Sequence, residues 1–184
     1  IAIGFSLGGN MLIKFLAAYA KDFPIRAAAT VSAPIDLAAT SRRFLAPRNR
    51  LYHRWLLANL KRESLRSPAA ITPAEKAAIQ AASTVYAFDD TFIAPGHGFA
   101  GAEDYYSRCS GIHFLPEVPV PLLAIHAGDD PWIPAGMYGH VMRSGNPLVS
   151  GLLSAGGGHV GFHAADDPVP WHDRAIAAFL ARTL

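Results

Sequence analysis

Ile1-Ala2-Ile3-Gly4-Phe5-Ser6-Leu7-Gly8-Gly9, residues 1–9, is the stretch of sequence that decides the fold. It places a serine between a short apolar run, typical of the end of a buried strand, and a segment at residues 7–21 whose apolar side chains recur at helical spacing. The side chains expected on the core-facing side of that helix are Met11, Leu12, Phe15, Leu16 and Tyr19.

The G-x-S-x-G pattern of Gly4, Ser6 and Gly8 occurs by chance in many sequences, so its place between a strand and a helix carries the argument. On so tight a turn the serine backbone is strained, and we expect a side chain at either glycine to collide with neighbouring elements. The Ser6 hydroxyl would stand clear at the helix N-terminus, where developing negative charge is favoured. The N–H of Leu7 is then the predicted oxyanion-hole donor. The alternative is a glycine-rich turn whose serine only caps the helix.

Three further apolar runs, at residues 27–32, 121–127 and 148–154, predict buried strands, and residues 171–181 predict a closing helix. Strands that are apolar throughout and separated by helices indicate a mostly parallel sheet with helices on both faces. Together with the strand, serine turn and helix at the start of the chain, this predicts an α/β protein with the α/β-hydrolase fold.

The predicted organisation is one domain with an insertion. Residues 1–36 and 112–184 form the expected core. Residues 37–111, with helices expected at 50–65 and 73–82 and loops elsewhere, form an expected helical cap insertion above the carboxyl ends of the strands. Because the first residue already lies within a strand, we expect the chain to be the C-terminal part of an α/β-hydrolase domain whose N-terminal strands are missing.

A serine hydroxyl needs a base to take its proton and a carboxylate to hold that base in one tautomer. In the α/β-hydrolase fold the acid follows a late strand and the base lies in the loop after the next strand, in the chain order Ser, acid, His. Asp130 follows the predicted strand at 121–127, and His159 follows the predicted strand at 148–154. The sequence therefore predicts Ser6 as nucleophile, Asp130 as orienting acid and His159 as general base.

Each of these assignments has a rival. Asp129 competes with Asp130, which is favoured because the hydrolase pattern separates the acid by two residues from a pair such as Ile133-Pro134; Asp129 would then cap the loop. His163 competes with His159, which is favoured because glycines crowd it, as expected where the backbone yields to a substrate.

The other histidines are predicted to be structural or exposed. His126 lies within a strand and is expected in or just below the core. No serine or acid lies in a convincing register with the remaining five, which are His53, His97, His113, His140 and His172. No His, Cys, Asp and Glu group has zinc-like spacing, and no P-loop is present.

With these residues in place, the sequence resembles the YheT-like esterase family of the α/β-hydrolase superfamily over nearly its whole length. The segments that carry the resemblance are GFSLGGNML (4–12), VSAPIDL (31–37), FDDTFIAPGHGF (88–99), DYYSRCS (104–110), PLLAIHAGDDPWIP (121–134) and GGGHVGF (156–162). The segments at 88–99 and 104–110 are more specific to the family than the triad. The resemblance implies hydrolysis of carboxylic esters, lipid-like ones among them, without a metal or organic cofactor, and it assigns the same triad.

One departure from the family pattern matters. Related families supply a second oxyanion donor from an early loop after the third strand, and that loop is absent from this chain. Loss of one such donor costs roughly a hundred- to a thousandfold in rate. By itself, therefore, the chain is expected to be inactive, and poorly stable because a central strand would be exposed.

Aromatic side chains gather in the insertion, where packing onto the core is the better explanation for each and lining of an acyl pocket is the alternative; they are Phe88, Phe92, Phe99, Tyr105, Tyr106 and Phe114. Phe5 is a better candidate for substrate contact, because it precedes the predicted nucleophile.

Half of the basic residues lie between residues 41 and 66, against only one acid, Glu63; they are Arg42, Arg43, Arg48, Arg50, Arg54, Lys61, Arg62 and Arg66. The helix in this region is expected to carry an apolar stripe opposite its arginines, formed by Leu51, Tyr52, Trp55, Leu56 and Leu60. Such a helix could make a peripheral contact with an anionic membrane surface. A solvated face on a cap helix explains the same pattern.

The composition narrows the class of protein. With 51% apolar and 16% charged residues, the chain is globular, and no apolar run reaches the length of a membrane span. A net charge of +2 gives no argument for nucleic acid. The single cysteine, Cys109, excludes an intrachain disulfide framework and suits a reducing compartment, so a cytoplasmic location is expected.

The predicted function is two-step acyl transfer from a small-molecule ester to water. An acyltransferase or a thioesterase could use the same triad, and a non-catalytic binding module could have kept the scaffold. A dehalogenase would need a carboxylate at position 6, and Ser6 excludes it.

Overall fold

A computed structural model describes residues 1–66 and 71–184 of the chain, which form two compact units. Ile1–Leu37 and Cys109–Leu184 make up the first, called the sheet unit below, and Ala38–Arg108 make up the second, the helical unit. The expected role of the second as a cap stays a prediction.

The sheet unit contains four parallel strands in the order β1-β2-β3-β4. Their bounds are β1 Ala2–Phe5, β2 Ala28–Val31, β3 Leu122–Ala127 and β4 Val149–Ser154. The register pairs Phe5 with Val31, Val31 with Ile125, and Ile125 with Leu152. Every residue of β2 and β3 is buried, as a parallel strand covered on both faces requires. The predicted parallel sheet is therefore confirmed.

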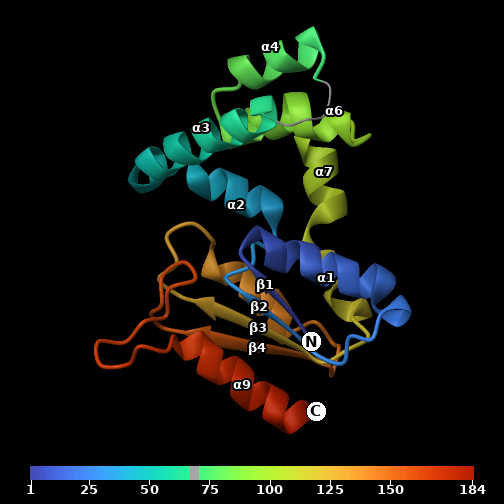
Figure 1. The fold of residues 1–184 in the computed structure, drawn as a ribbon, viewed down its shortest axis with the longest axis vertical. Coiled ribbons are helices and arrows are strands. Elements are labelled where there is room, and N and C mark those ends of the chain that lie inside the picture. Colours follow the sequence, from blue (N-terminus) through green and yellow to red (C-terminus); the bar gives the residue numbers. More distant parts are fainter. Residues whose placement is uncertain (67–70) are drawn as a thin grey trace. The chain divides into compact units, whose positions relative to one another are not determined.

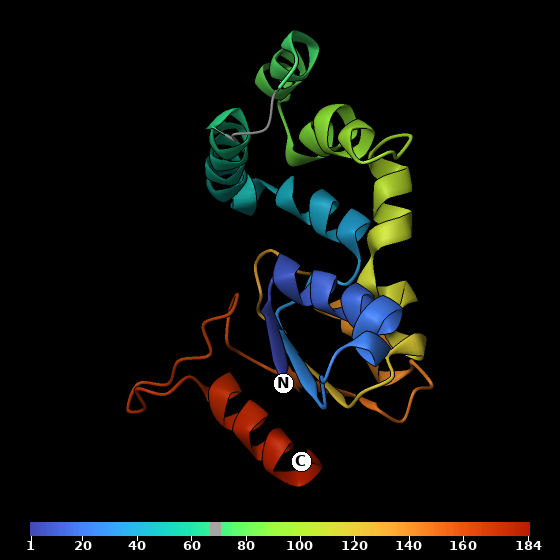
Figure 2. The same cartoon turned by 45° about the vertical axis from the view of Figure 1, so that its right-hand side comes forward.

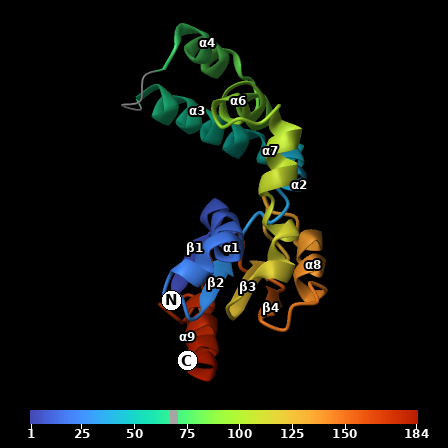
Figure 3. The same cartoon turned by 90° about the vertical axis from the view of Figure 1, so that its right-hand side faces the viewer.

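Helices cover both faces of this sheet: α1 (Leu7–Tyr19) packs on one face and α9 (Trp171–Thr183) on the other (Figure 1, Figure 2). On the α9 side, Ile176 and Phe179 pack with Val31, Ile125 and Phe162. Short α8 (Gly139–Met142) lies beside β4 (Figure 3). The remaining elements of the unit are η1 Ala20–Asp22, η4 Gly111–His113, η5 Leu115–Glu117 and η6 Ala135–Tyr138.

The buried face of α1 differs from the predicted one. Its buried residues are Gly9, Asn10, Ile13 and Leu16, whereas Met11 is 64% exposed and Tyr19 is also exposed. The reason is the close approach of Gly9 to the sheet, where a Cβ would lie 2.7 Å from Ala33 Cβ. That contact turns the helix so that the 9, 13 and 16 positions face inward, and the expected core positions other than Leu16 lie at the side or outside.

The helical unit contains more helix than the sequence predicts. Its elements are α2 Leu37–Phe44, η2 Pro47–Asn49, α3 Arg50–Arg66, α4 Pro73–Ala81, α5 Val85–Phe88, the π-helical η3 Asp89–Ile93, α6 Ala94–Gly96 and α7 Ala102–Cys109. Helices α3 and α4 match the two predicted helices. The expectation of loops elsewhere is wrong. Helices α2 and α7 span about two turns each, too short for a clear helical period, and α5, η3 and α6 follow one another without a break from Val85 to Gly96, with a π-helical stretch that interrupts the 3.6-residue period.

The helical unit has its own apolar core, made by Leu57, Ile79, Ala82, Val85 and Phe88. Phe88 is almost fully buried and its ring packs against Phe92 at 5.3 Å. Tyr106 is also buried and donates its hydroxyl hydrogen bond to Asp89. Phe88, Phe92 and Tyr106 therefore pack within the helical unit itself, and the expected packing of the insertion onto the core stays a prediction.

The residues of the predicted apolar stripe of α3 are exposed or half-buried. Leu57, which was not assigned to it, is buried with His53, whereas Leu51 and Trp55 are exposed. Within residues 1–66 and 71–184, no helix combines the length and the apolar character that crossing a membrane would require.

Candidate active site

Ser6 occupies the turn between β1 and α1 with a backbone φ of 48°, a left-handed conformation that side-chain-bearing residues rarely adopt. Its own N–H donates to Val31 O at 2.9 Å, and its carbonyl accepts from Gly9 N at 2.8 Å. The turn is thus fixed by the neighbouring strand and by the first turn of the helix. The strained geometry expected for a nucleophile elbow is present.

The glycines around Ser6 serve different purposes. A Cβ at Gly4 would lie 2.7 Å from Gly8 O, so this position excludes a side chain. At Gly8 no described heavy atom comes within 4 Å of a Cβ, and the expectation that a side chain would collide there is wrong. The crowded glycine on the helix side is Gly9, one residue later, because it is the residue that packs on Ala33.

The Ser6 hydroxyl does not cap α1. Ser6 is the N-cap residue of that helix, yet its side chain makes no capping hydrogen bond. Its Oγ lies 2.9 Å from Nε2 of His159 instead. The reading of this serine as a simple helix cap therefore fails.

Asp130 lies in the loop after β3 with a fully buried side chain. Its Oδ1 accepts hydrogen bonds from the N–H groups of Trp132 (2.9 Å) and Ile133 (3.0 Å), and its Oδ2 lies 2.9 Å from Nδ1 of His159. Burial acts to raise the pKa of Asp130, but the hydrogen bond to His159 and the two backbone donors outweigh it, and the net pKa is lowered. The carboxylate therefore stays ionised and faces the imidazole.

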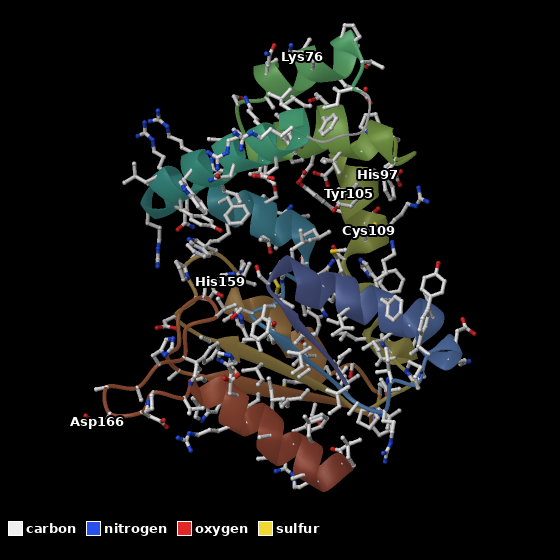
Figure 4. The ribbon with its side chains drawn as sticks, in the orientation of Figure 1. Lys76, His97, Tyr105, Cys109, His159 and Asp166 are labelled. Atoms are coloured by element: carbon white, nitrogen blue, oxygen red, sulfur yellow. The ribbon has the colours of Figure 1, made fainter. Side chains whose placement is uncertain are left out.

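His159 joins the other two side chains. Because Nδ1–H donates to the Asp130 carboxylate, Nε2 carries the lone pair that accepts the Ser6 hydroxyl. The imidazole is almost completely buried, with 9% of its side chain exposed, and its ring lies 4.6 Å from the ring of Trp132. Figure 4 shows His159 at the end of the sheet to which the strand arrows point.

The loop that carries His159 is held on both sides of the histidine. The N–H of Gly158 donates to Asp129 Oδ1 at 2.8 Å, and the N–H of Val160 donates to Ser32 Oγ at 3.2 Å. Gly158, Val160 and Ser32 all have positive φ values, so the local backbone is unusual and depends on these contacts. Asp129 was predicted to cap its own loop. Its side chain instead accepts a hydrogen bond from the loop that carries His159.

Ser32 and Trp132 contact the histidine or its loop, and neither was among the site residues predicted from the sequence. Ser32 follows β2 directly and Trp132 follows Asp130 by two residues, and position after a buried strand was the only signal available.

The rival residues do not reach Ser6 by any hydrogen bond among those the structure describes. His163 is exposed. His126 is fully buried, as its place in a strand predicts; its Nδ1 lies 3.9 Å from Asp130 Oδ2 and its ring stacks on Tyr138 at 4.2 Å. Burial lowers the pKa of His126 despite the nearby carboxylate, so this imidazole is neutral.

The other predicted histidine roles agree with the structure where they can be compared. His53 is buried and its Nε2 accepts from the N–H of Val85 at 3.0 Å. His172 is buried on α9, where burial lowers its pKa, and its Nε2 lies 3.2 Å from Asp173. Among the residues described, no three or more His, Cys, Asp or Glu side chains are grouped so that they could hold a metal ion.

Leu7 and Phe5 flank the serine. Leu7 is the first residue of α1, and its N–H precedes the hydrogen-bond ladder of the helix. Phe5 ends β1, is about half exposed, and meets the ring of His172 edge-on at 5.6 Å.

Solved structures share this architecture. A Pyrococcus furiosus esterase aligns with a TM-score of 0.52 at 19% identity, covering 100% of this chain and 53% of its own. A Paleococcus ferrophilus monoacylglycerol lipase aligns with a TM-score of 0.53 at 16% identity, covering 99% of this chain and 68% of its own. The chain therefore has the fold of the α/β hydrolases.

Sequence relatives define the family more narrowly. The chain is 40% identical to Escherichia coli (strain K12) YheT, described as a candidate esterase, over 100% of this chain and 55% of that protein. It is 31% identical to an abhydrolase domain-containing protein of Dictyostelium discoideum, over 99% of this chain and 47% of that protein. The mouse phospholipase ABHD3 is 29% identical over 88% of this chain and 40% of that protein.

The chain belongs to the YheT-like esterase family of the α/β-hydrolase superfamily. It spans about half the length of these relatives. No family model matches the chain.

Proposed function

We propose that the protein containing this chain is a serine hydrolase that cleaves carboxylic esters through an acyl-enzyme intermediate. The observation that carries the proposal is the continuous hydrogen-bonded line from Asp130 through His159 to Ser6, with both contacts at 2.9 Å. The strained backbone of Ser6 and its uncapped hydroxyl support the same role.

In the first half-reaction, Ser6 Oγ attacks the ester carbonyl while Nε2 of His159 takes the hydroxyl proton. The tetrahedral oxyanion accepts a hydrogen bond from the N–H of Leu7. The carbon–oxygen bond to the alcohol then breaks, and the leaving oxygen takes the proton from Nε2. Asp130 holds the imidazole tautomer and stabilises its charged form throughout.

In the second half-reaction, a water molecule gives a proton to Nε2 and attacks the acyl carbon. The bond to Ser6 Oγ breaks, the acid leaves, and the serine regains its proton from the imidazole. Each cycle consumes one ester and one water and returns the enzyme unchanged.

The substrate class proposed is an acyl ester of a lipid-like alcohol, with Phe5 as a substrate contact beside the nucleophile. The named activities of relatives support it, since they include a mouse phospholipase and a yeast monoacylglycerol lipase. A panel of short-chain nitrophenyl esters, monoacylglycerols, phospholipids and acyl thioesters, each with water or an added alcohol as acceptor, separates esterase from thioesterase and acyltransferase activity.

The decisive experiment is labelling of the full-length protein by a fluorophosphonate probe. We expect the wild type to be labelled, Ser6→Ala to be unlabelled with an unchanged far-ultraviolet circular dichroism spectrum, and Ser107→Ala, which alters an exposed serine, to be labelled as the wild type. Undiminished labelling of Ser6→Ala would refute the nucleophile. A folded wild type without labelling would support a non-catalytic binding module instead.

A further inference from the structure

Helix α3 of the helical unit presents an apolar line to solvent. Leu51 is 82% exposed, and Ala58 and Leu65, which follow it at seven-residue intervals on the same side of the helix, are exposed as well. Trp55, 61% exposed, lies beside this line. Exposing large apolar side chains along one face of a helix costs free energy in water. Such a face is typical of an interaction surface.

The rotation of α3 that turns these residues outward is fixed by the opposite face. Leu57 packs in the core of the helical unit with Ile79 and Phe88. His53 is buried and accepts the N–H of Val85 at 3.0 Å. Rotating the helix to bury Leu51 and Trp55 would break both contacts, so their exposure belongs to the fold of this unit.

Basic side chains flank the apolar line on both sides. Arg50, Arg54 and Lys61 follow one side, and Arg62 and Arg66 the other, as the helical period places them. Within the described residues, Arg50, Arg54 and Arg66 make no ion pair.

The other charged residues of α3 also leave its outward face positively charged. Lys61 donates to Gln80 O at 2.9 Å and Arg62 to the side chain of Asn59, so the hydrogen-bond partners of both are uncharged groups. The single acid of the helix, Glu63, lies away from the apolar line, about 140° around the axis from Ala58.

We propose that this outward face of α3 docks on an anionic lipid surface, with Leu51 and Trp55 in the interfacial layer and the flanking arginines on the headgroup phosphates. Complementarity supports this: apolar side chains at the centre match the acyl boundary, and a rim in which five basic residues stand against the single acid Glu63 matches anionic headgroups. A nucleic acid would use the arginines and leave Leu51 without a partner. The inference is independent of the proposed catalysis, because Ser6 lies in the other unit.

The test is cosedimentation of the full-length protein with phosphatidylcholine vesicles that contain or lack phosphatidylserine. We expect binding that requires phosphatidylserine and weakens with added salt. Arg50→Gln/Arg54→Gln should weaken it about twenty-fivefold, at about fivefold per arginine near the surface. Leu51→Ser/Trp55→Ser should weaken it by about tenfold or more.

Matched controls lie in the sheet unit. Arg143→Gln/Arg182→Gln removes the same charge from two exposed sites, and Met142→Ser removes one exposed apolar side chain. We expect all three of these substitutions, and Ser6→Ala, to leave vesicle binding unchanged. Circular dichroism and thermal unfolding establish that each variant is folded before its binding is scored.

Insertion can be measured directly in a full-length variant in which every tryptophan other than Trp55, Trp132 and Trp171 included, is replaced by phenylalanine. Brominated phosphatidylcholine in the anionic vesicles should quench its fluorescence. Equal binding by folded wild type and face variants, binding that does not need phosphatidylserine, or an unquenched Trp55 on bound protein would each overturn the proposal. So would heparin or RNA binding that accounts for the arginine effect while Leu51→Ser/Trp55→Ser leaves vesicle binding intact.

Discussion

The N–H of Gly158 donates a hydrogen bond to Asp129 Oδ1 over 2.8 Å, one residue before His159. This contact ties the histidine loop to the loop of Asp130, because Asp129 and Asp130 are neighbours in the chain. We expect Asp129→Ala to lower kcat about tenfold, with KM nearly unchanged, since a small displacement of the imidazole impairs proton transfer more than ester binding. Steady-state kinetics on a soluble nitrophenyl ester measure both parameters.

Asp129→Asn is the informative companion, because the amide oxygen keeps an acceptor for the Gly158 N–H. It should restore most of the lost kcat. Asp166→Ala, at an exposed aspartate, should behave as the wild type. If Asp129→Asn were as impaired as Asp129→Ala, the charge of Asp129 and not its hydrogen bond would be the important property.

Ser32 provides the second support of the same loop, through the N–H of Val160 at 3.2 Å. We expect Ser32→Ala to lower kcat about threefold, a smaller effect than at Asp129 because this hydrogen bond is longer. The double variant Asp129→Ala/Ser32→Ala should lose more activity than the product of the single losses, because each contact then no longer compensates for the other. Strictly multiplicative losses would show that the two contacts act independently.

The strands and the order of the candidate triad could be predicted from the sequence because each rests on a local signal. Buried parallel strands are apolar throughout, and Asp130 and His159 each follow such a strand. The helix faces could not be predicted in the same way. The inward face of α1 depends on the contact between Gly9 and Ala33, and that of α3 on the contacts of His53 and Leu57, which join residues distant in sequence.

The hydrogen bonds that hold the His159 loop could not be predicted from the sequence, for a related reason. Asp129 and Ser32 act on backbone N–H groups more than 25 residues away along the chain, and a backbone donor leaves no trace in the residue type that carries it. The helices between residues 84 and 109 likewise leave no clear period in the sequence, because α7 spans only about two turns and the π-helical η3 interrupts the helical segment from Val85 to Gly96.

Gly8 and Gly9 offer a matched pair of substitutions. Gly8→Ala should be tolerated and should raise the free energy of unfolding by about 0.5–1 kcal/mol, because the site is open and alanine favours the helix. Gly9→Ala should lower it by about 1–3 kcal/mol, because the new methyl group would meet Ala33 Cβ at 2.7 Å. Urea denaturation of the two variants measures the difference, and equal stabilities would contradict the packing described for α1.

The raised pKa of the Asp89 carboxyl predicts that the stability of the fold depends on pH, independently of catalysis. Burial raises the pKa of its carboxyl from 3.8 to about 6, although the hydrogen bond from Tyr106 acts in the opposite direction. Because the folded pKa lies above the unfolded one, the folded state favours the protonated form, and stability is lost as the pH rises from about 4 to about 6. A shift of about two units corresponds to about 3 kcal/mol, and partial exposure of the carboxyl reduces the expected effect to about 1–2 kcal/mol.

Asp89→Asn keeps an acceptor for the Tyr106 hydroxyl and removes the buried charge. Its stability relative to the wild type should therefore increase between pH 4 and pH 7, within the window set by the two pKa values. Thermal unfolding of both proteins across this range gives the comparison, with Asp166→Asn as the control at an exposed carboxyl. A constant difference between wild type and Asp89→Asn over the whole range would mean that Asp89 titrates with the same pKa in the folded and unfolded chain, and that the helical unit tolerates this carboxylate without cost.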